Sequence, residues 1–224
     1  MTRHELARTI DHTLLKPEAT PAHVDVLCDE AREYGFFAVC VNPIYVRPAA
    51  ERLRGSRTCV ASVAGFPLGA QRSDVKADEA RRAIDDGAAE VDMVIHVGAL
   101  LAGDVGAVRD DIYAVSKAVH AGAQGRILKV ILETGLLSAD QIIAGCRCAA
   151  EGEADFVKTS TGFHASGGAT IEAVRLMHKH AAPIKVKASG GIRDLRTALA
   201  MLEAGASRLG VSAGVAIVSA FEAS

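Results

Sequence analysis

The sequence predicts a single (β/α)8 barrel of the TIM type that spans residues 1–224. Short β-branched runs alternate eight times with longer helical patterns, without a linker or a break in composition. Half of the residues are hydrophobic and only 4% are aromatic, so the core is made of small aliphatic side chains, as around a parallel sheet. Expected helices end in Gly-Ala steps, a loop typical of repeated βα units, at Gly87-Ala88, Gly122-Ala123 and Gly205-Ala206.

The elements follow in chain order from these patterns. The expected strands cover 8–12, 36–41, 58–64, 90–95, 126–132, 154–158, 183–188 and 207–210. The expected helices cover 21–34, 43–54, 73–87, 103–121, 138–150, 169–181, 194–204 and 213–221. Helix starts are indicated by Ser73, Ser138 and Asp194 as N-caps, and helix ends by Gly35, Gly87, Gly122 and Gly205. A doubly wound open sheet is the alternative fold, but the first βα turn has no G-x-G-x-x-G motif.

Composition excludes several classes of function. The net charge is −2 and no basic block occurs, so nucleic acid is not expected as a partner. No apolar run reaches the roughly 18 residues of a membrane span, and the first residues lack a signal-like apolar segment, so we expect a cytoplasmic protein. The five cysteines are odd in number and read as reduced thiols. His178 and His180 cannot share a helix face, so no metal site is expected there.

A lysine closes one of the expected strands. Lys158 follows the apolar run 154–157 and is followed by the polar turn Thr159–Gly162. Burial would lower the pKa of its amine and produce a nucleophile near neutral pH. By itself the segment is equally compatible with a lysine that ends a strand and reaches into solvent.

The parity of the strand residues decides which side chains enter the barrel. One parity of each strand faces the helices and the other faces the interior. Val91, Met93 and Ile95 are apolar and mark the helix-facing side of their strand, and the same test applies to Leu128 and Val130. The predicted inward set in the fourth, fifth and seventh strands is Glu90, Asp92, Val94, His96, Lys129, Ile131, Glu133, Lys185, Lys187 and Ser189.

In the sixth strand Asp155 interrupts the outer parity, but Lys158 shares a side with Phe156. Four neighbouring strands then contribute inward charges, namely Asp92, Lys129, Lys158 and Lys187. Such charges are costly in a barrel interior unless they are paired, and an ion-pair network explains them only in part. Lys129 and Lys187 would repel a proton from Lys158, which is the environment of a Schiff-base lysine. Asp92 is then suited to move protons, with simple pairing to Lys187 as the alternative.

Two glycine-rich loops predict a phosphate site. Ser189–Arg193 reads SGGIR and Gly210–Gly214 reads GVSAG, after the seventh and eighth strands. Glycines let backbone N–H groups approach an anion, and these loops are the usual phosphate position in this fold. Arg193 either adds a charge-assisted contact or lies on the surface.

Seven segments resemble the deoxyribose-phosphate aldolases, a family of class I aldolases, over nearly the whole chain. They read IDHTLLKP (10–17), VCVNP (39–43), VAGFPLG (63–69), EVDMVI (90–95), LKVILET (128–134), DFVKTSTGF (155–163) and KASGGIR (187–193). The resemblance implies reversible cleavage of 2-deoxy-D-ribose 5-phosphate to D-glyceraldehyde 3-phosphate and acetaldehyde, without metal or organic cofactor. It further implies a role in deoxyribonucleoside breakdown and a homo-oligomer, most simply a dimer.

The resemblance also implies roles for individual residues. Lys158 corresponds to the Schiff-base lysine, Lys187 to the lysine that lowers its pKa, and Asp92 to the carboxylate of the proton relay. The substrate-binding positions implied are Asp11, Thr13, Lys129, Gly162, Gly190, Gly191, Gly210 and Ser212.

Three departures from the family pattern stand out. His96 replaces a usual Asn, and Val211 and Ala213 replace hydroxyl residues of a Gly-Thr-Ser-Ser-Gly loop, which leaves phosphate to the backbone amides. The sequence also ends soon after Phe221, without the terminal Tyr of some members, so slower proton exchange at acetaldehyde C2 is expected. Two alternatives are a phosphosugar isomerase or epimerase, which needs a carboxylate or Cys base, and a weakly catalytic phosphosugar-binding barrel.

Overall fold

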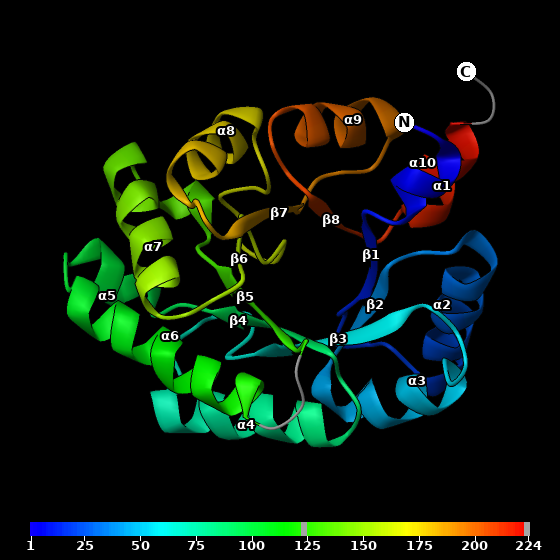
Figure 1. Cartoon of the computed structure of the whole chain (residues 1–224), viewed down its shortest axis with the longest axis horizontal. Helices are drawn as coiled ribbons and strands as arrows, with labels where there is room; N and C mark the ends of the chain where they lie inside the picture. The colour runs from blue at the N-terminus through cyan, green and yellow to red at the C-terminus, as the bar shows by residue number, and fades with distance from the viewer. Residues whose placement is uncertain (122–124, 222–224) are drawn as a thin grey trace.

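A computed structural model describes residues 1–121 and 125–221. Eight parallel strands close into a barrel in chain order, with the first paired to the last, and helices surround them (Figure 1). The predicted (β/α)8 barrel is therefore confirmed. The strands are β1 (Ile10–Leu14), β2 (Ala38–Val41), β3 (Cys59–Ala64), β4 (Glu90–Val94), β5 (Ile127–Ile131), β6 (Phe156–Lys158), β7 (Lys185–Ser189) and β8 (Arg208–Val211).

The outer ring contains more helices than the sequence patterns predicted. Two short helices, Arg3–Ala7 and Val97–Leu101, were not expected; Gly103, with φ of +81°, lies in the turn after the second of them. Short 3-10 turns, η1 (Pro43–Tyr45) and η2 (Thr134–Leu136), follow β2 and β5. The helices are α1 (Arg3–Ala7), α2 (Pro21–Tyr34), α3 (Val46–Arg52), α4 (Ser73–Asp85), α5 (Val97–Leu101), α6 (Val105–His120), α7 (Ala139–Glu151), α8 (Ile171–His180), α9 (Leu195–Glu203) and α10 (Gly214–Ala220).

The helix caps can be compared with the helix boundaries predicted from the sequence. Ser138 and Asp194 are N-caps, and their side chains accept hydrogen bonds from the backbone N–H groups of Gln141 (3.3 Å) and Thr197 (2.8 Å). The prediction for Ser73 is wrong, because Ser73 is already helical and the preceding residue is the cap. Gly35 ends α2 with φ of +70° as predicted. The predicted signals at Gly122 and Ala123 lie outside the described residues.

Some strands begin later than predicted, because the apolar runs extend beyond the residues that pair in the sheet. Phe36 is fully buried, yet β2 begins at Ala38, and β6 likewise begins at Phe156 rather than at 154. Hydrophobic residues next to a strand are buried against the helices without pairing in the sheet. An apolar run therefore marks burial, and its ends overestimate the paired segment.

The interior of the barrel is divided between an apolar and a charged half. The alternate residues predicted to face outward, such as Val91, Met93 and Leu128, lie in the main core between the strands and the helices. A second, small apolar cluster, made of Leu15, Ala38, Cys40, Ala61 and Val63, fills the interior beside β2 and β3. The remaining strands surround the charged side chains, and this half holds the candidate site.

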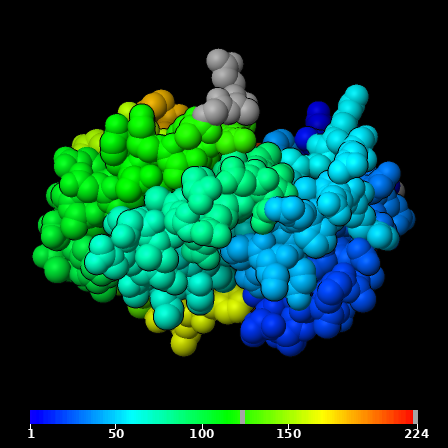
Figure 2. Space-filling model, turned by 90° about the horizontal axis from the view of Figure 1, so that it is seen from below, coloured from blue at the N-terminus to red at the C-terminus, as the bar shows by residue number. Residues whose placement is uncertain are grey.

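A buried ion pair links two of the outer helices. α4 and α6 pack side by side, and they lie on the face shown in Figure 2. Between them Lys76 Nζ donates to Asp111 Oδ2 (2.7 Å) and to the carbonyl of Val94 at the end of β4 (3.0 Å). Both side chains are buried, so this pair ties two helices to the strand that carries Asp92.

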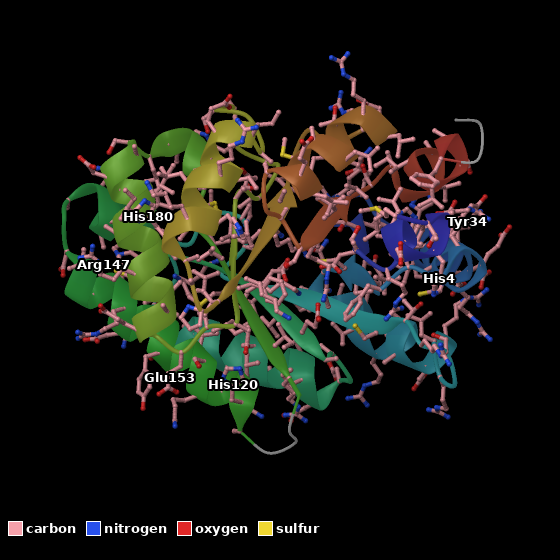
Figure 3. All side chains as sticks on the ribbon, turned by 45° about the horizontal axis from the view of Figure 1, so that its top comes forward. His4, Tyr34, His120, Arg147, Glu153 and His180 are labelled. Carbon is pink, nitrogen blue, oxygen red and sulfur yellow. The ribbon has the colours of Figure 1, made fainter. Side chains whose placement is uncertain are left out.

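Exposed polar side chains cover the periphery. The labelled Arg147 and His180 extend from the outer helices (Figure 3). His178 and His180 are both exposed on α8. Across residues 1–121 and 125–221, every helix is too short or too polar to cross a membrane.

Candidate active site

A buried cluster of charges lies inside the barrel and is centred on Asp92. One oxygen of Asp92 accepts hydrogen bonds from Lys158 and Lys187, each at 2.8 Å, and the other accepts from Lys129 at 2.8 Å. Their side chains come from four consecutive strands, β4 to β7, with an inward parity that the sequence predicted. The structure thus brings together the four charges inferred from the sequence.

Three further groups complete this cluster. Asp11 of β1 accepts hydrogen bonds from Lys187 and, at 2.8 Å, from Arg208 of β8. Glu90 lies 2.6 Å from Lys129 Nζ and 3.1 Å from Arg208 Nη1. Arg208 was not among the predicted site residues, although the apolar Leu209 and Val211, which have the opposite parity in the same strand, already indicate its inward direction. We call these seven residues, Asp11, Glu90, Asp92, Lys129, Lys158, Lys187 and Arg208, the charge cluster.

Three residues predicted to point inward lie elsewhere. Glu133 does not pair with the lysines but accepts a hydrogen bond from the backbone N–H of Thr161 at 3.3 Å. His96 is exposed, because the chain turns into α5 directly after β4. Lys185 is also exposed, at the amino end of β7, and lies over the ring of Phe156. Glu133 and His96 lie beyond the ends of their strands, where the parity rule no longer applies. Lys185, in contrast, keeps the parity of its register partner Phe156 but lies at the exposed end of β7.

The environment of the charge cluster changes the pKa values of its lysines in opposite directions. Burial, followed by repulsion from Lys187, lowers the pKa of Lys158 although Asp92 opposes this change. Burial also opposes the charge of Lys187, but Asp11 and Asp92 outweigh it and raise the pKa of Lys187. The pKa of Lys129 is raised well above its ordinary value, because Asp92, Glu90 and Asp11 outweigh the effect of burial. Lys158 is therefore the lysine most ready to act as a free amine.

The cationic side chains of the cluster also change the pKa values of its carboxylates. Burial favours the neutral acid, but the three lysines outweigh it and hold the pKa of Asp92 well below its usual range. The pKa of Asp11 is likewise lowered, because Lys187, Lys129 and Arg208 outweigh burial. Burial raises the pKa of the nearby Cys40 thiol to about 11, so this thiol stays protonated.

A cavity of about 370 Å³ opens above the cluster, at the carboxyl ends of the strands. Lys158 is the member of the charge cluster that reaches its wall; Asp11, Asp92, Lys129 and Lys187 lie deeper in the barrel and are fully buried. Lys16 and Arg193 add positive charge to the wall, and Arg193 is exposed. The other predicted site residues on this wall are Thr13, Gly162, Gly190, Gly191, Gly210 and Ser212.

Glycine allows a close approach at two of these positions. Gly190 has φ of +86°, and a Cβ there would lie 2.9 Å from the Cα of Gly168 in the loop after β6. A Cβ on Gly210 would lie 3.0 Å from Cε of Lys187. Gly190 thus lets two loops meet at the cavity, and Gly210 leaves room for the second lysine.

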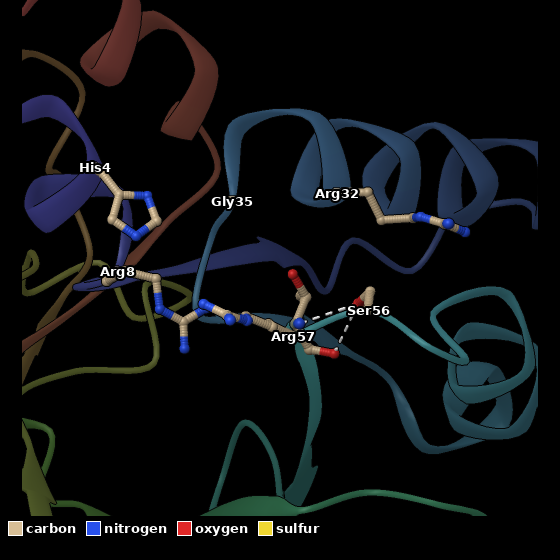
Figure 4. A pocket seen from close by; sticks show the side chains of 7 residues that line it. His4, Arg8, Arg32, Gly35, Ser56 and Arg57 are labelled. Atoms are coloured by element: carbon tan, nitrogen blue, oxygen red, sulfur yellow. Dashed lines mark hydrogen bonds between the residues drawn. The ribbon is translucent and has the colours of Figure 1, made fainter.

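A second pocket, of about 350 Å³, lies at the opposite end of the barrel (Figure 4). Its residues precede strands, and its charged side chains are those of His4, Arg8, Arg32 and Arg57. None of the charge cluster lines this pocket. The described residues also include no group of His, Cys, Asp and Glu side chains suited to hold a metal ion. The cavity above Lys158 is therefore the candidate active site.

Comparison with known proteins gives a consistent picture. Residues 6–220 match the model of the DeoC/LacD family aldolases. The chain is 55% identical over 211 residues to a deoxyribose-phosphate aldolase of Brevibacillus brevis, covering 94% of this chain and 93% of the relative. It is 53% identical over 221 residues to that of Thermococcus gammatolerans, covering 97% of each chain.

Solved structures agree with this similarity. The tetrameric deoxyribose phosphate aldolase from Aeropyrum pernix superposes with a TM-score of 0.91 at 34% identity, over 99% of this chain and 92% of the other. A protein described as QR15, an aldolase, gives a TM-score of 0.90 at 38% identity, over 97% and 96% of the two chains.

Proposed function

The chain belongs to the DeoC/LacD aldolase family, and from this premise we propose that it cleaves 2-deoxy-D-ribose 5-phosphate reversibly through a Schiff base on Lys158. The observation that carries the proposal is the position of Lys158. Its amine has a lowered pKa and lines the same cavity as the glycine loops after β7 and β8. One cavity thus offers a nucleophile for a carbonyl and backbone donors for a phosphate.

The reaction begins at the aldehyde carbon of the open-chain sugar. The Lys158 amine adds to this carbon, and loss of water from the carbinolamine forms a protonated imine. Removal of the proton from the C3 hydroxyl breaks the C2–C3 bond, and its electrons move into the imine to form an enamine. Glyceraldehyde 3-phosphate leaves, C2 of the enamine takes up a proton, and water releases acetaldehyde and the free lysine.

Asp92 and Lys187 support these proton transfers. Asp92 Oδ2 lies 2.8 Å from Lys158 Nζ, so it can exchange protons with groups formed on that nitrogen. Lys187 donates to the same oxygen and, because its pKa is raised, keeps its charge beside Lys158. That charge disfavours protonation of the free amine.

The substrate phosphate is assigned to the glycine loops. Gly190, Gly191 and Ser212 lie on the wall of the cavity, and exposed Arg193 and Lys16 add positive charge near them. Val211 and Ala213 offer no hydroxyl, so backbone N–H groups carry more of the binding. The proposal includes Thr13 and Gly162 as wall residues that contact the sugar.

Trapping with borohydride tests the proposal. Reduction in the presence of acetaldehyde would leave a stable adduct on the lysine that forms the imine, and peptide mass mapping identifies that residue. We expect the adduct on Lys158. An adduct elsewhere, or none, would refute the assignment and favour the isomerase or the phosphosugar-binding barrel.

A matched pair of variants extends this test. Lys158→Leu should abolish turnover and keep the fold, because the replaced side chain is buried and Leu is apolar. Lys179→Leu, on the exposed end of α8, serves as the control and should retain activity. Circular dichroism verifies that both variants are folded.

The cellular setting and assembly are part of the same proposal. The products fit the breakdown of deoxyribonucleoside-derived sugars, and the five free cysteines fit a reducing cytoplasm. The tetrameric relative supports a homo-oligomer, of which a dimer is the smallest form. Light scattering after size-exclusion chromatography measures the mass in solution, and a monomer would contradict this part.

A further inference from the structure

Arg208 is a member of the charge cluster to which the proposed mechanism gives no role. It begins β8 at the amino end of the barrel, where its guanidinium lies 3.5 Å from the centre of the Phe37 ring and 5.6 Å from that of Phe156. Its Nη1 donates to Asp11 (2.8 Å) and lies 3.1 Å from Glu90 Oε2. Only 8% of the side chain is exposed, so stacking and ion pairs hold it in place.

The charges of the cluster do not balance when every group is ionised. It contains four cations, Lys129, Lys158, Lys187 and Arg208, and three carboxylates. A single excess charge in a buried site is costly, and loss of one proton removes it. An arginine does not give up its proton in a protein, so the proton has to come from a lysine.

The contacts between lysines and carboxylates determine which lysine loses this proton. Lys129 lies within 4.0 Å of all three carboxylates, Lys187 of two of them, and Lys158 of one. Each carboxylate contact favours the charged form of the lysine. Lys158 has the fewest, and it is also the lysine that reaches the cavity.

We propose that Arg208 is a positioning residue that sets the charge count of the cluster and thereby leaves Lys158 as an uncharged amine. The inference rests on the proposed function, since it explains how the imine-forming lysine becomes nucleophilic. Arg208 does not contact the cavity, so it acts through the carboxylates that bind the other two lysines.

Removal of the arginine charge tests this proposal. In Arg208→Met the three lysines meet three carboxylates, so Lys158 keeps its proton. We expect the apparent pKa of Lys158 to rise by about one unit or more. The value of kcat/KM at neutral pH should fall by roughly tenfold for each unit by which this pKa rises, and it should recover as the pH is raised. Arg208→Lys, which preserves the cation, should lie closer to the wild type.

A second substitution separates charge counting from support of the fold. Glu90→Gln combined with Arg208→Met leaves three cations and two carboxylates, which restores the excess of one. The double variant should therefore move the pKa of Lys158 back toward the wild-type value. If Arg208 only supported the fold, the double variant would differ more from the wild type than Arg208→Met does, because it has lost two partners. Arg82→Met, in an exposed ion pair on α4, is the control and should cause no shift.

The measurement does not depend on aldolase activity. Brief acylation with acetic anhydride at a series of pH values, followed by peptide mass mapping, reports the fraction of Lys158 present as free amine. If a folded Arg208→Met shows the wild-type acylation profile, or if the double variant fails to return toward it, the proposal is wrong. If Arg208→Met does not fold, Glu90→Gln alone decides, because it should lower the pKa of Lys158, and an unchanged profile would refute the inference.

Borohydride trapping of the wild type is read separately. Absence of an adduct on Lys158 would overturn the proposed function, whereas the acylation profiles would still report how Arg208 affects that amine. The failure of one proposal is therefore distinguishable from the failure of the other.

Discussion

At the scale of single residues, Asp92 connects the groups on which the proposed chemistry depends. Its carboxylate is fully buried and accepts hydrogen bonds from three lysines. An amide in this position retains one acceptor oxygen but carries no negative charge. It can neither balance the lysines nor take up a proton at neutral pH.

Asp92→Asn should therefore lower kcat by about 10²–10⁴-fold, the usual contribution of a general acid or base. Steady-state kinetics with deoxyribose 5-phosphate measure the effect, and circular dichroism verifies folding. Asp140→Asn, on the exposed start of α7, is the matched control and should behave as the wild type. An unchanged kcat in Asp92→Asn would remove Asp92 from the proton relay.

At the scale of elements, hydrogen bonds to Glu133, the second residue after β5, hold the loop that follows β6. Glu133 has a left-handed backbone with φ of +58°, and its buried carboxylate binds the backbone N–H and the hydroxyl of Thr161. Thr161 and Gly162 line the cavity directly after Lys158. Glu133 thus positions one wall of the site although it makes no contact with the lysines.

Glu133→Ala should weaken substrate binding and lower the stability. The buried N–H of Thr161 loses its acceptor, which costs about 1–3 kcal/mol in the free energy of unfolding. We expect KM to rise more than kcat falls, because the wall moves and the amine does not. Glu133→Gln keeps an acceptor oxygen and should be milder. Kinetics together with urea unfolding measure both effects, and equal behaviour of the two variants would contradict this role.

The packing of α4 against α6 depends on a buried pair. Lys76→Met leaves the carboxylate of Asp111 buried without its partner, so we expect a loss of about 3–5 kcal/mol in the free energy of unfolding. Arg82→Met breaks an exposed pair on the same helix and should cost less than about 1 kcal/mol. Urea unfolding compares the two variants. If both lose the same amount, the buried pair has no special role in this packing.

At the scale of the whole molecule, the charge cluster makes stability depend on pH. The folded-state pKa values of Asp11 and Asp92 lie below the unfolded value of about 3.9. Their contribution is therefore present above about pH 4 and is lost as the pH falls toward the folded values, because the unfolded chain then binds more protons. Lys129 and Lys187, with raised pKa values, contribute below about pH 10.4 and lose this contribution above it.

The free energy of unfolding should accordingly fall below pH 4, by up to about 1.4 kcal/mol per pH unit for each aspartate. Asp11→Asn should be less stable at pH 7 but show a shallower decline. Asp140→Asn, as before, is the control and should follow the wild type. Urea unfolding between pH 2.5 and 7 measures these slopes, and parallel curves for wild type and Asp11→Asn would contradict the assignment.

The sequence by itself determined the barrel, its order of strands and the inward direction of Asp92, Lys129, Lys158 and Lys187. These features depend on local periodicity, because alternate residues of a strand face opposite sides whatever the partners are. The family resemblance added the reaction, which periodicity does not contain.

Only the tertiary structure decided how the inward charges are shared. Asp11 and Arg208 are 197 positions apart in the chain, yet they pair because β1 and β8 close the barrel. The same closure gives Lys158 one carboxylate contact and Lys129 three. A sequence pattern indicates which way a side chain points, but the protonation of a buried lysine depends on distances to groups from other strands.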